Sequence, residues 1–105
     1  DKIYDDAEEM PSFPGGQVAL MRFLSSNMKY PKEEQESGTQ GRVVVQFVVG
    51  RDGSICDAKV TRSVSPALDQ EALRIVSVMP RWKPGMKGGK AVRVQYTMPL
   101  MFRLQ

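Results

Sequence analysis

The sequence predicts an α+β domain with the chain order α-β-β-α-β, in which two helices pack on one face of a three-stranded antiparallel sheet. Two segments carry apolar residues at helical spacing, and three others have the composition or alternation of strands. The length of 105 residues suffices for one hydrophobic core. Hydrophobic residues make up 41% and charged residues 26% of the chain, which is typical of a folded protein and not of a disordered one.

Acidic residues dominate the beginning of the chain. Five of the first nine residues are Asp or Glu, and they show no periodic apolar pattern. Pro11 and the run Phe13-Pro14-Gly15-Gly16 follow, and these residues break regular structure. We therefore expect residues 1–12 to be an acidic leader or the remnant of a linker, and residues 13–105 to form the domain.

Two segments have the apolar periodicity of amphipathic helices. The first spans residues 17–28, where Leu20, Leu24 and Met28 share one face. The second begins with Ser65-Pro66, a capping hydroxyl followed by a proline suited to the first helical position. The polar residues 32–41 are predicted to be a solvated connection. One apolar stripe continues the second helix up to Pro80, and it consists of Leu68, Ala72, Ile75, Val76 and Met79.

Two strands are predicted in the middle of the chain. Residues 43–49 are almost all β-branched or aromatic, a composition typical of a strand with neighbours on both sides. Asp52-Gly53 then favours a tight hairpin, after which residues 55–62 return as a second strand. Period-two alternation would bury one face of this second strand, and we expect that face to hold Cys56, Ala58 and Val60.

The third predicted strand is the clearest. Residues 92–104 alternate between apolar and polar side chains. The preceding helix lets this strand lie antiparallel to the first one, which gives the spatial order 2-1-3. Pro99 lies inside the strand and has no N–H to donate to a neighbour. The last strand is therefore predicted to be an edge of the sheet.

The composition argues against catalysis and metal binding. Histidine is absent and cysteine occurs once, so the chain lacks an internal disulfide and the usual proton carrier of catalytic sites. The carboxylates among residues 5–9 lack the turn glycine and the fixed offsets of a calcium loop. The sequence therefore predicts no enzyme, no cofactor and no metal site.

Single-stranded nucleic acid is a remote alternative partner, because small α+β sheets with a basic charge can stack bases on exposed aromatic rings. The net charge is only +3, and the outward sheet positions offer no aromatic platform. The three aromatic residues Phe47, Tyr96 and Phe102 fall on the apolar faces of their strands. We therefore expect a protein partner and no nucleic acid.

The predicted edge strand has two interpretations. An unpaired edge can accept an extended peptide as an additional strand. Charged residues and prolines also protect such edges from aggregation, and Lys90, Arg93, Pro99 and Arg103 fit that role. The residues alone leave both interpretations open.

A series of short motifs extends over about residues 13–104, and their order and spacing are more specific than any one of them. They are Tyr30-Pro31, Gly38, Gln40-Gly41, residues 43–49, Asp52-Gly53, residues 60–63, Leu68-Asp69, Glu71-Ala72-Leu73, Met79-Pro80, Trp82-Lys83-Pro84-Gly85, Gly89-Lys90, Val94, Tyr96, Pro99 and Phe102. Together they resemble the TonB C-terminal domain family.

The resemblance implies a periplasmic domain of a Gram-negative energy transducer, anchored in the inner membrane and driven there by motor proteins of the ExbB–ExbD type. No apolar run in this sequence reaches the length of a bilayer span, and its acidic start differs from a signal peptide. The implied anchor would therefore lie outside this sequence. Similar domains in signalling membrane metallopeptidases and lipoproteins provide the alternative, an interaction module without a role in transport.

The resemblance also implies a partner and a site. Such domains bind the TonB box, a short extended segment of outer-membrane transporters, by strand addition at the last strand, in support of energy-dependent uptake. Homodimerisation through the same edge would compete with this use. Arg93, Gln95 and Thr97 would face outward. The residues expected to bind the partner are Val92, Arg93, Val94, Gln95, Tyr96, Thr97 and Met98.

Overall fold

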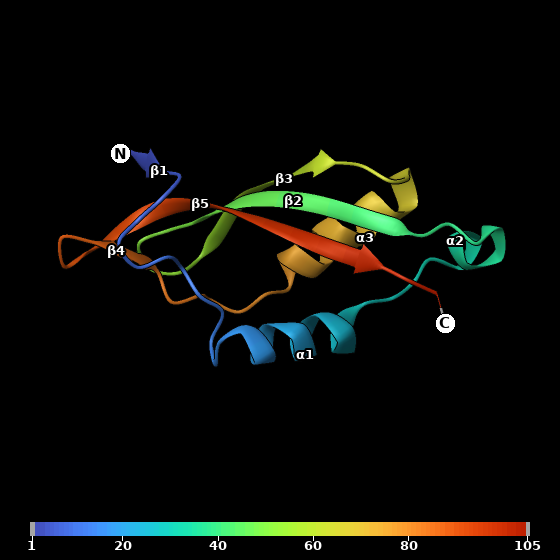
Figure 1. Cartoon of the computed structure of the whole chain (residues 1–105), viewed down its shortest axis with the longest axis horizontal. Helices are drawn as coiled ribbons and strands as arrows, with labels where there is room; N and C mark the ends of the chain where they lie inside the picture. Colours follow the sequence, from blue (N-terminus) through green and yellow to red (C-terminus); the bar gives the residue numbers. More distant parts are fainter. Residues whose placement is uncertain (1, 105) are drawn as a thin grey trace.

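The computed structural model describes residues 2–104 as one twisted sheet with helices packed against it. Figure 1 shows the long strands running along the molecule, with α3 behind β2 and α1 below β5. The elements in chain order are β1 (Ile3–Tyr4), α1 (Gln17–Asn27), α2 (Lys32–Ser37), β2 (Gly41–Val49), β3 (Ile55–Arg62), α3 (Pro66–Ser77), β4 (Gly85–Lys87) and β5 (Lys90–Phe102).

The sheet has five strands in the order β1-β5-β2-β3, with β4 paired to β5. The predicted order of the three long strands is confirmed, because β2 lies between β3 and β5 and is antiparallel to both. The prediction of a three-stranded antiparallel sheet was wrong. The sheet is mixed, since β1 runs parallel to β5. Both additional strands are two or three residues long, too short for an alternating sequence pattern.

The helices follow the predicted signals with one addition. Ser65 caps α3, because its Oγ accepts a hydrogen bond from the backbone N–H of Leu68 at 3.2 Å, and Pro66 opens the helix. The segment predicted as a connection contains α2. None of its residues is buried, so it has no apolar stripe to reveal it, and Gly38 ends it in the left-handed conformation with φ 73°.

The core lies between one face of the sheet and helices α1 and α3. Alternate residues of β2 and β5 point into it in register, with Val45 beside Met98 and Phe47 beside Tyr96. Leu20 of α1 is buried in the same core as Ile75 of α3. The predicted alternation of β5 is confirmed, since its core-facing residues include the buried Val94, Met98, Leu100 and Phe102.

A bulge in β3 changes the predicted faces of that strand. Asp57 adopts φ 54°, and the register with β2 shifts at this point. The additional residue inverts the alternation, so Ile55 and Val60 both pack against the core. The prediction that Cys56 is buried was therefore wrong, because its side chain is exposed on the face opposite the helices.

The predicted hairpin between β2 and β3 is confirmed and lies directly against the core. The N–H of Gly53 donates to the carbonyl of Gly50 at 2.9 Å, and the N–H of Trp82 donates to the carbonyl of Gly53 at 2.8 Å. The Trp82 ring is 3% exposed and meets the rings of Phe47 and Tyr96 edge-on, at centroid distances of 5.4 and 4.9 Å. These contacts join the hairpin to the segment before β4.

Candidate partner-binding edge

The outer edge of β5 is the candidate site. β5 has 13 residues, and β2 pairs with residues 94–102 along its inner edge. On the outer edge, β1 covers residues 93 and 94, whereas β4 pairs with residues 90–92 at the beginning of the strand. Within the described residues 2–104, no strand pairs with the outer edge from residue 95 to residue 102. That stretch of main chain is therefore open to another strand.

The seven residues predicted to bind a partner fall into two groups along this edge. Val92 is paired with Gly85 of β4, and the next two residues are paired outward with β1. The other four residues have no outward strand partner in the described chain, and they are Gln95, Tyr96, Thr97 and Met98. The first part of the predicted site is therefore covered by this chain itself, and the second part is open.

The side chains of β5 alternate between the two faces as predicted. Val94 and Met98 are buried on the helix side, where Tyr96 is partly buried. On the opposite face Thr97 is exposed and Gln95 is half-buried. A strand added at this edge would consequently place its own side chains alternately near the helices and near this polar face.

The two edges of the sheet differ in how they are protected. On β3, the bulge at Asp57 and the exposed charges of Lys59 and Arg62 oppose the addition of another strand. The open stretch of β5 contains no charged residue and no bulge against β2. Pro99 is the only protective feature on it, so β5 is the edge better suited to pairing.

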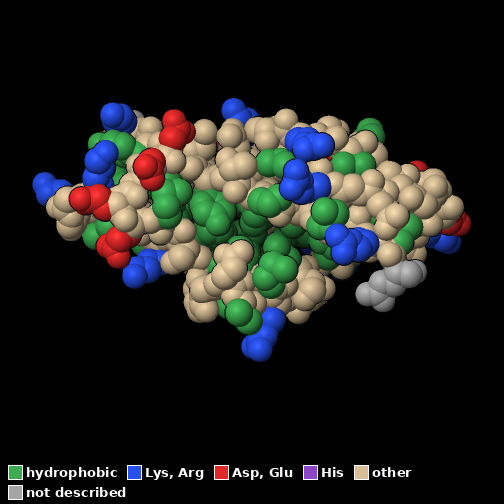
Figure 2. Space-filling view, viewed as in Figure 1, with side chains coloured by type: hydrophobic (Ala, Val, Ile, Leu, Met, Phe, Trp, Pro, Cys, Tyr) green, Lys and Arg blue, Asp and Glu red, His purple; other side chains and the backbone are tan. Residues whose placement is uncertain are grey.

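An apolar groove runs beside the open edge, between β5 and α1. The volume of this groove is ≈ 480 Å³. Figure 2 shows hydrophobic side chains gathered in the centre of this face, above α1. Residues from both faces of β5 line the groove, so the main-chain edge itself lies within it. The lining residues are Gln17, Leu20, Met21, Leu24, Ser25, Met28, Arg42, Tyr96, Met98, Pro99, Leu100 and Met101.

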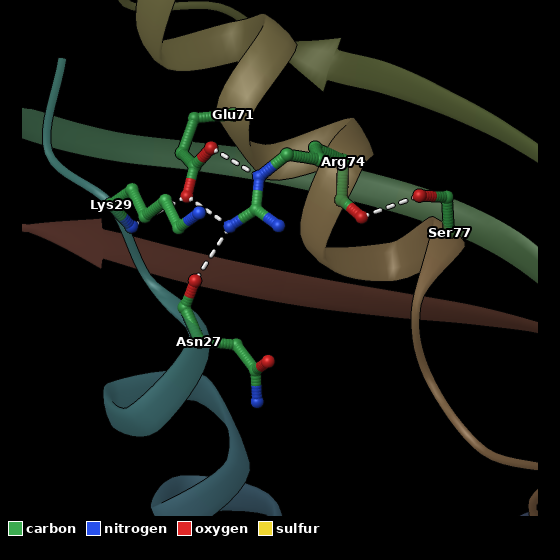
Figure 3. Close-up of polar contacts among 5 residues, drawn as sticks. All are labelled: Asn27, Lys29, Glu71, Arg74 and Ser77. Atoms are coloured by element: carbon green, nitrogen blue, oxygen red, sulfur yellow. Dashed lines mark hydrogen bonds and ion pairs between the residues drawn. The ribbon is translucent and has the colours of Figure 1, made fainter.

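A buried carboxylate fixes the end of α1 that forms one wall of this groove (Figure 3). Glu71 of α3 is 8% exposed, and its Oε2 accepts the backbone N–H of Lys29 at 2.6 Å. Arg74 donates to both carboxylate oxygens, at 2.7 and 2.8 Å, and to the carbonyl of Asn27 at 2.6 Å. Burial alone would raise the pKa of Glu71, but these hydrogen bonds outweigh it and hold the pKa below its usual value.

The beginning of the chain contacts the same region of the sheet. Gln95 donates from Nε2 to Asp5 Oδ1 at 3.3 Å, and the N–H of Gly88 donates to the Glu8 carboxylate. Glu9 also exchanges backbone hydrogen bonds with Met86 of β4, at 3.1 and 2.9 Å. The sequence carried no signal for these contacts, because they use backbone groups and scattered carboxylates and not an apolar pattern.

Metal-binding clusters and membrane-spanning helices are both absent from the part of the chain that the structure describes. Within residues 2–104, no three His, Cys, Asp or Glu side chains are grouped so that they could hold a metal ion. In the same part of the chain, no helix is long and apolar enough to cross a bilayer.

The family model described as the Gram-negative bacterial TonB protein C-terminal matches residues 26–104. The chain belongs to this family. The resemblance seen in the sequence motifs is thereby confirmed. Protein TonB of Pseudomonas aeruginosa is 34% identical over 76 residues, which cover 72% of this chain and 22% of that protein. Protein TonB of Haemophilus influenzae is 33% identical over 84 residues, covering 76% of this chain and 31% of that protein.

Solved structures agree with the TonB family assignment. The Helicobacter pylori TonB C-terminal domain in solution has a TM-score of 0.64 and 27% identity, covering 84% of this chain and 79% of that one. The Pseudomonas aeruginosa TonB C-terminal domain in solution has a TM-score of 0.60 and 36% identity, and the match covers 73% of this chain and 78% of that one. This TonB-type chain spans between a fifth and a third of the length of the two full-length relatives.

Proposed function

We propose that this chain is the periplasmic partner-binding domain of a TonB-type energy transducer, and that it binds the TonB box of outer-membrane transporters as an additional strand on β5. The observation that carries the proposal is the open main-chain edge over residues 95–102, beside an apolar groove. Strand addition needs no catalytic side chain, since backbone hydrogen bonds supply the affinity.

The edge suits a domain that transmits force. Ladder hydrogen bonds run across the strands, so a pull along the strand axis loads several of them together. β5 is in turn paired with β2 over residues 94–102, and β2 is paired with β3. A load on the bound segment would therefore spread into the centre of the sheet.

The position of the open stretch determines which part of β5 a partner strand would pair with first. The partner strand would pair first with residues 95–98 and the residues that follow them. It would extend to Arg93 and Val94 only where β1 is displaced, because β1 occupies that part of the edge. Of the seven predicted residues, the last four thus form the initial site.

The rest of the transducer is part of the proposal. An N-terminal anchor in the inner membrane, coupled to a motor of the ExbB–ExbD type, would supply the pull that supports uptake.

The aromatic rings of the sheet favour a protein partner over nucleic acid, because Phe47 and Phe102 are buried under the helices. A base-stacking platform would need such rings on the open face.

A titration followed by NMR tests the proposal. The probe is a synthetic TonB-box peptide from a transporter encoded in the same genome, added to the ¹⁵N-labelled chain. We expect the largest shifts at the amides of Gln95 to Met98. A peptide with proline at alternate positions is the control, since it cannot complete the ladder. Unchanged β5 amides at saturating peptide, in a folded and monomeric chain, would refute strand addition.

A further inference from the structure

We propose that the groove between α1 and β5 is a side-chain pocket for the bound strand, which selects an extended partner segment carrying a large apolar residue on the side that faces the helices. The inference rests on the proposed function and deepens it. Main-chain pairing alone accepts almost any extended sequence, so a pocket at the edge is what would give the interaction selectivity.

The position of the groove relative to the edge carries the inference. Side chains from both faces of β5 line it, with Met98 and Leu100 from the helix side and Pro99 and Met101 from the other. A strand added to β5 would lie about 4.8 Å from it, within this groove. Every second side chain of that strand would then point between β5 and α1.

The groove leaves apolar surface uncovered on its helical wall. Met21 of α1 is 59% exposed although it lines the groove, and Met101 across from it is 47% exposed. Leu24 and Met28 complete this wall and are only partly buried. An apolar side chain entering here would remove that surface from water, which favours binding.

The charge of the groove limits the chemistry of its occupant. Arg42 is the only ionisable side chain with a formal charge at neutral pH among the lining residues, and Arg22 is the only charged residue of α1. A lysine or arginine on the partner strand would meet like charge and lose its hydration. The groove therefore fits a neutral apolar residue, and carboxylates beside that residue would be favoured.

The side chains that line the groove predict how selective it is among the apolar residues of a partner strand. Four of the lining residues are methionines, out of seven in the chain: Met21, Met28, Met98 and Met101. Methionine is unbranched and adapts its shape to its neighbours. We therefore expect the groove to reject charged residues strongly but to accept leucine, isoleucine, valine or phenylalanine with similar affinity.

Two matched variants of α1 test the pocket. Met21→Glu places a carboxylate in the groove, whereas Val18→Glu places the same charge at an exposed position of the helix that does not line it. Both residues are largely exposed, at 59% and 66%, so neither change should unfold the domain. With the TonB-box peptide, we expect Met21→Glu to weaken binding by about tenfold and Val18→Glu by less than about twofold.

The readout separates this inference from the proposed function. Amide shifts of residues 95–98 report strand addition, and ¹³C-methyl shifts of the four groove methionines report entry of a side chain. If the peptide shifts the amide resonances of residues 95–98 but not the methionine methyl resonances, or if the two variants have equal effects, the pocket is refuted while strand addition stands. If the amide resonances of residues 95–98 do not shift at all, both strand addition and the pocket are refuted. Methyl shifts that grow with protein concentration in the absence of peptide would show that a second copy of the chain fills the groove, which also overturns the inference.

Discussion

Ile3 of β1 lies beside Arg93 of β5 in parallel register, so a segment of the chain itself occupies part of the proposed binding edge. β1 is only two residues long, and Ile3 is 40% exposed. Little apolar burial holds such a strand in place, and it should open at a low free-energy cost compared with the core strands. β1 is therefore placed to compete with a partner strand for the first part of the edge.

Removal of residues 1–6 is expected to strengthen peptide binding. The deletion exposes the outer edge of Arg93 and Val94, and it leaves Glu9 and Ser12 to keep their hydrogen bonds with the β4 region. Calorimetric titration should show affinity for the TonB-box peptide rising by roughly threefold or more, since no pairing has to be broken first. Identical affinities for the two chains would show that β1 does not compete.

Glu71 should make stability depend on pH. Its pKa is lowered in the folded state, so the stabilisation that it contributes is present above its ordinary pKa of about 4.3 and is lost as the pH falls through the folded value. Urea unfolding at neutral pH should show Glu71→Gln less stable than the parent by about 2 kcal/mol. The difference should shrink steadily toward pH 2.

Glu36→Gln provides the matched control for this experiment. Glu36 is exposed on α2, and its replacement should change stability by less than about 0.5 kcal/mol at any pH. If the difference between the parent and Glu71→Gln stays constant from pH 7 to pH 2, the ionised carboxylate does not stabilise the junction of α1 and α3.

Gly53 should tolerate no side chain. It has φ +85°, and a Cβ built there would lie 1.9 Å from the carbonyl oxygen of Trp82. Gly53→Ala is therefore expected to lower the free energy of unfolding by at least about 3 kcal/mol, measured with urea. Gly88→Ala is the control, because φ is +59° there but no atom lies within 4 Å, and it should cost only about 1 kcal/mol. Equal losses would mean that conformation, and not the contact with Trp82, restricts Gly53.

The exposed thiol of Cys56 should react in the native protein. The bulge at Asp57 turns the side chain away from the core, so iodoacetamide should label it fully without denaturant, as mass spectrometry would show. In a Cys56→Ser background, a cysteine introduced by Val45→Cys should stay unlabelled until the protein unfolds, since Val45 is fully buried. Protection of Cys56 in the native state would contradict the bulged register of β3.

The long elements could be predicted from sequence because their own residues determine them. The apolar runs of β2 and β5 and the Ser65 cap of α3 are local signals, and tertiary structure agrees with them. β1 and the bulge at Asp57 carry no such signal. Pairing with β5 and β2 determines them, and one inserted residue is enough to invert the faces of β3.

The same distinction applies to the candidate site. Pro99 and the chain order predicted that the last strand is an edge of the sheet. That prediction was only partly right, because β1 pairs with Arg93 and Val94 and leaves the edge open only from residue 95 onward. The groove could not be predicted, because it depends on where α1 lies relative to β5. The hydrogen bonds of Glu71 with Lys29 and of Arg74 with Asn27 fix that position, and each joins residues more than forty positions apart in the sequence. A helical apolar pattern shows that Met21 can face a neighbour, but not that part of it stays uncovered.

Hydrogen exchange along β5 tests strand addition most directly. In a parallel or antiparallel ladder, alternate amides of β5 point toward the outer edge, and those amides become hydrogen-bonded only when a strand is added there. With saturating TonB-box peptide, we predict that exchange slows by at least about tenfold at the outward amides between residues 95 and 102, while the inward amides, already paired with β2, change little. Unchanged exchange at the outward amides of a chain that binds the peptide would contradict strand addition at β5.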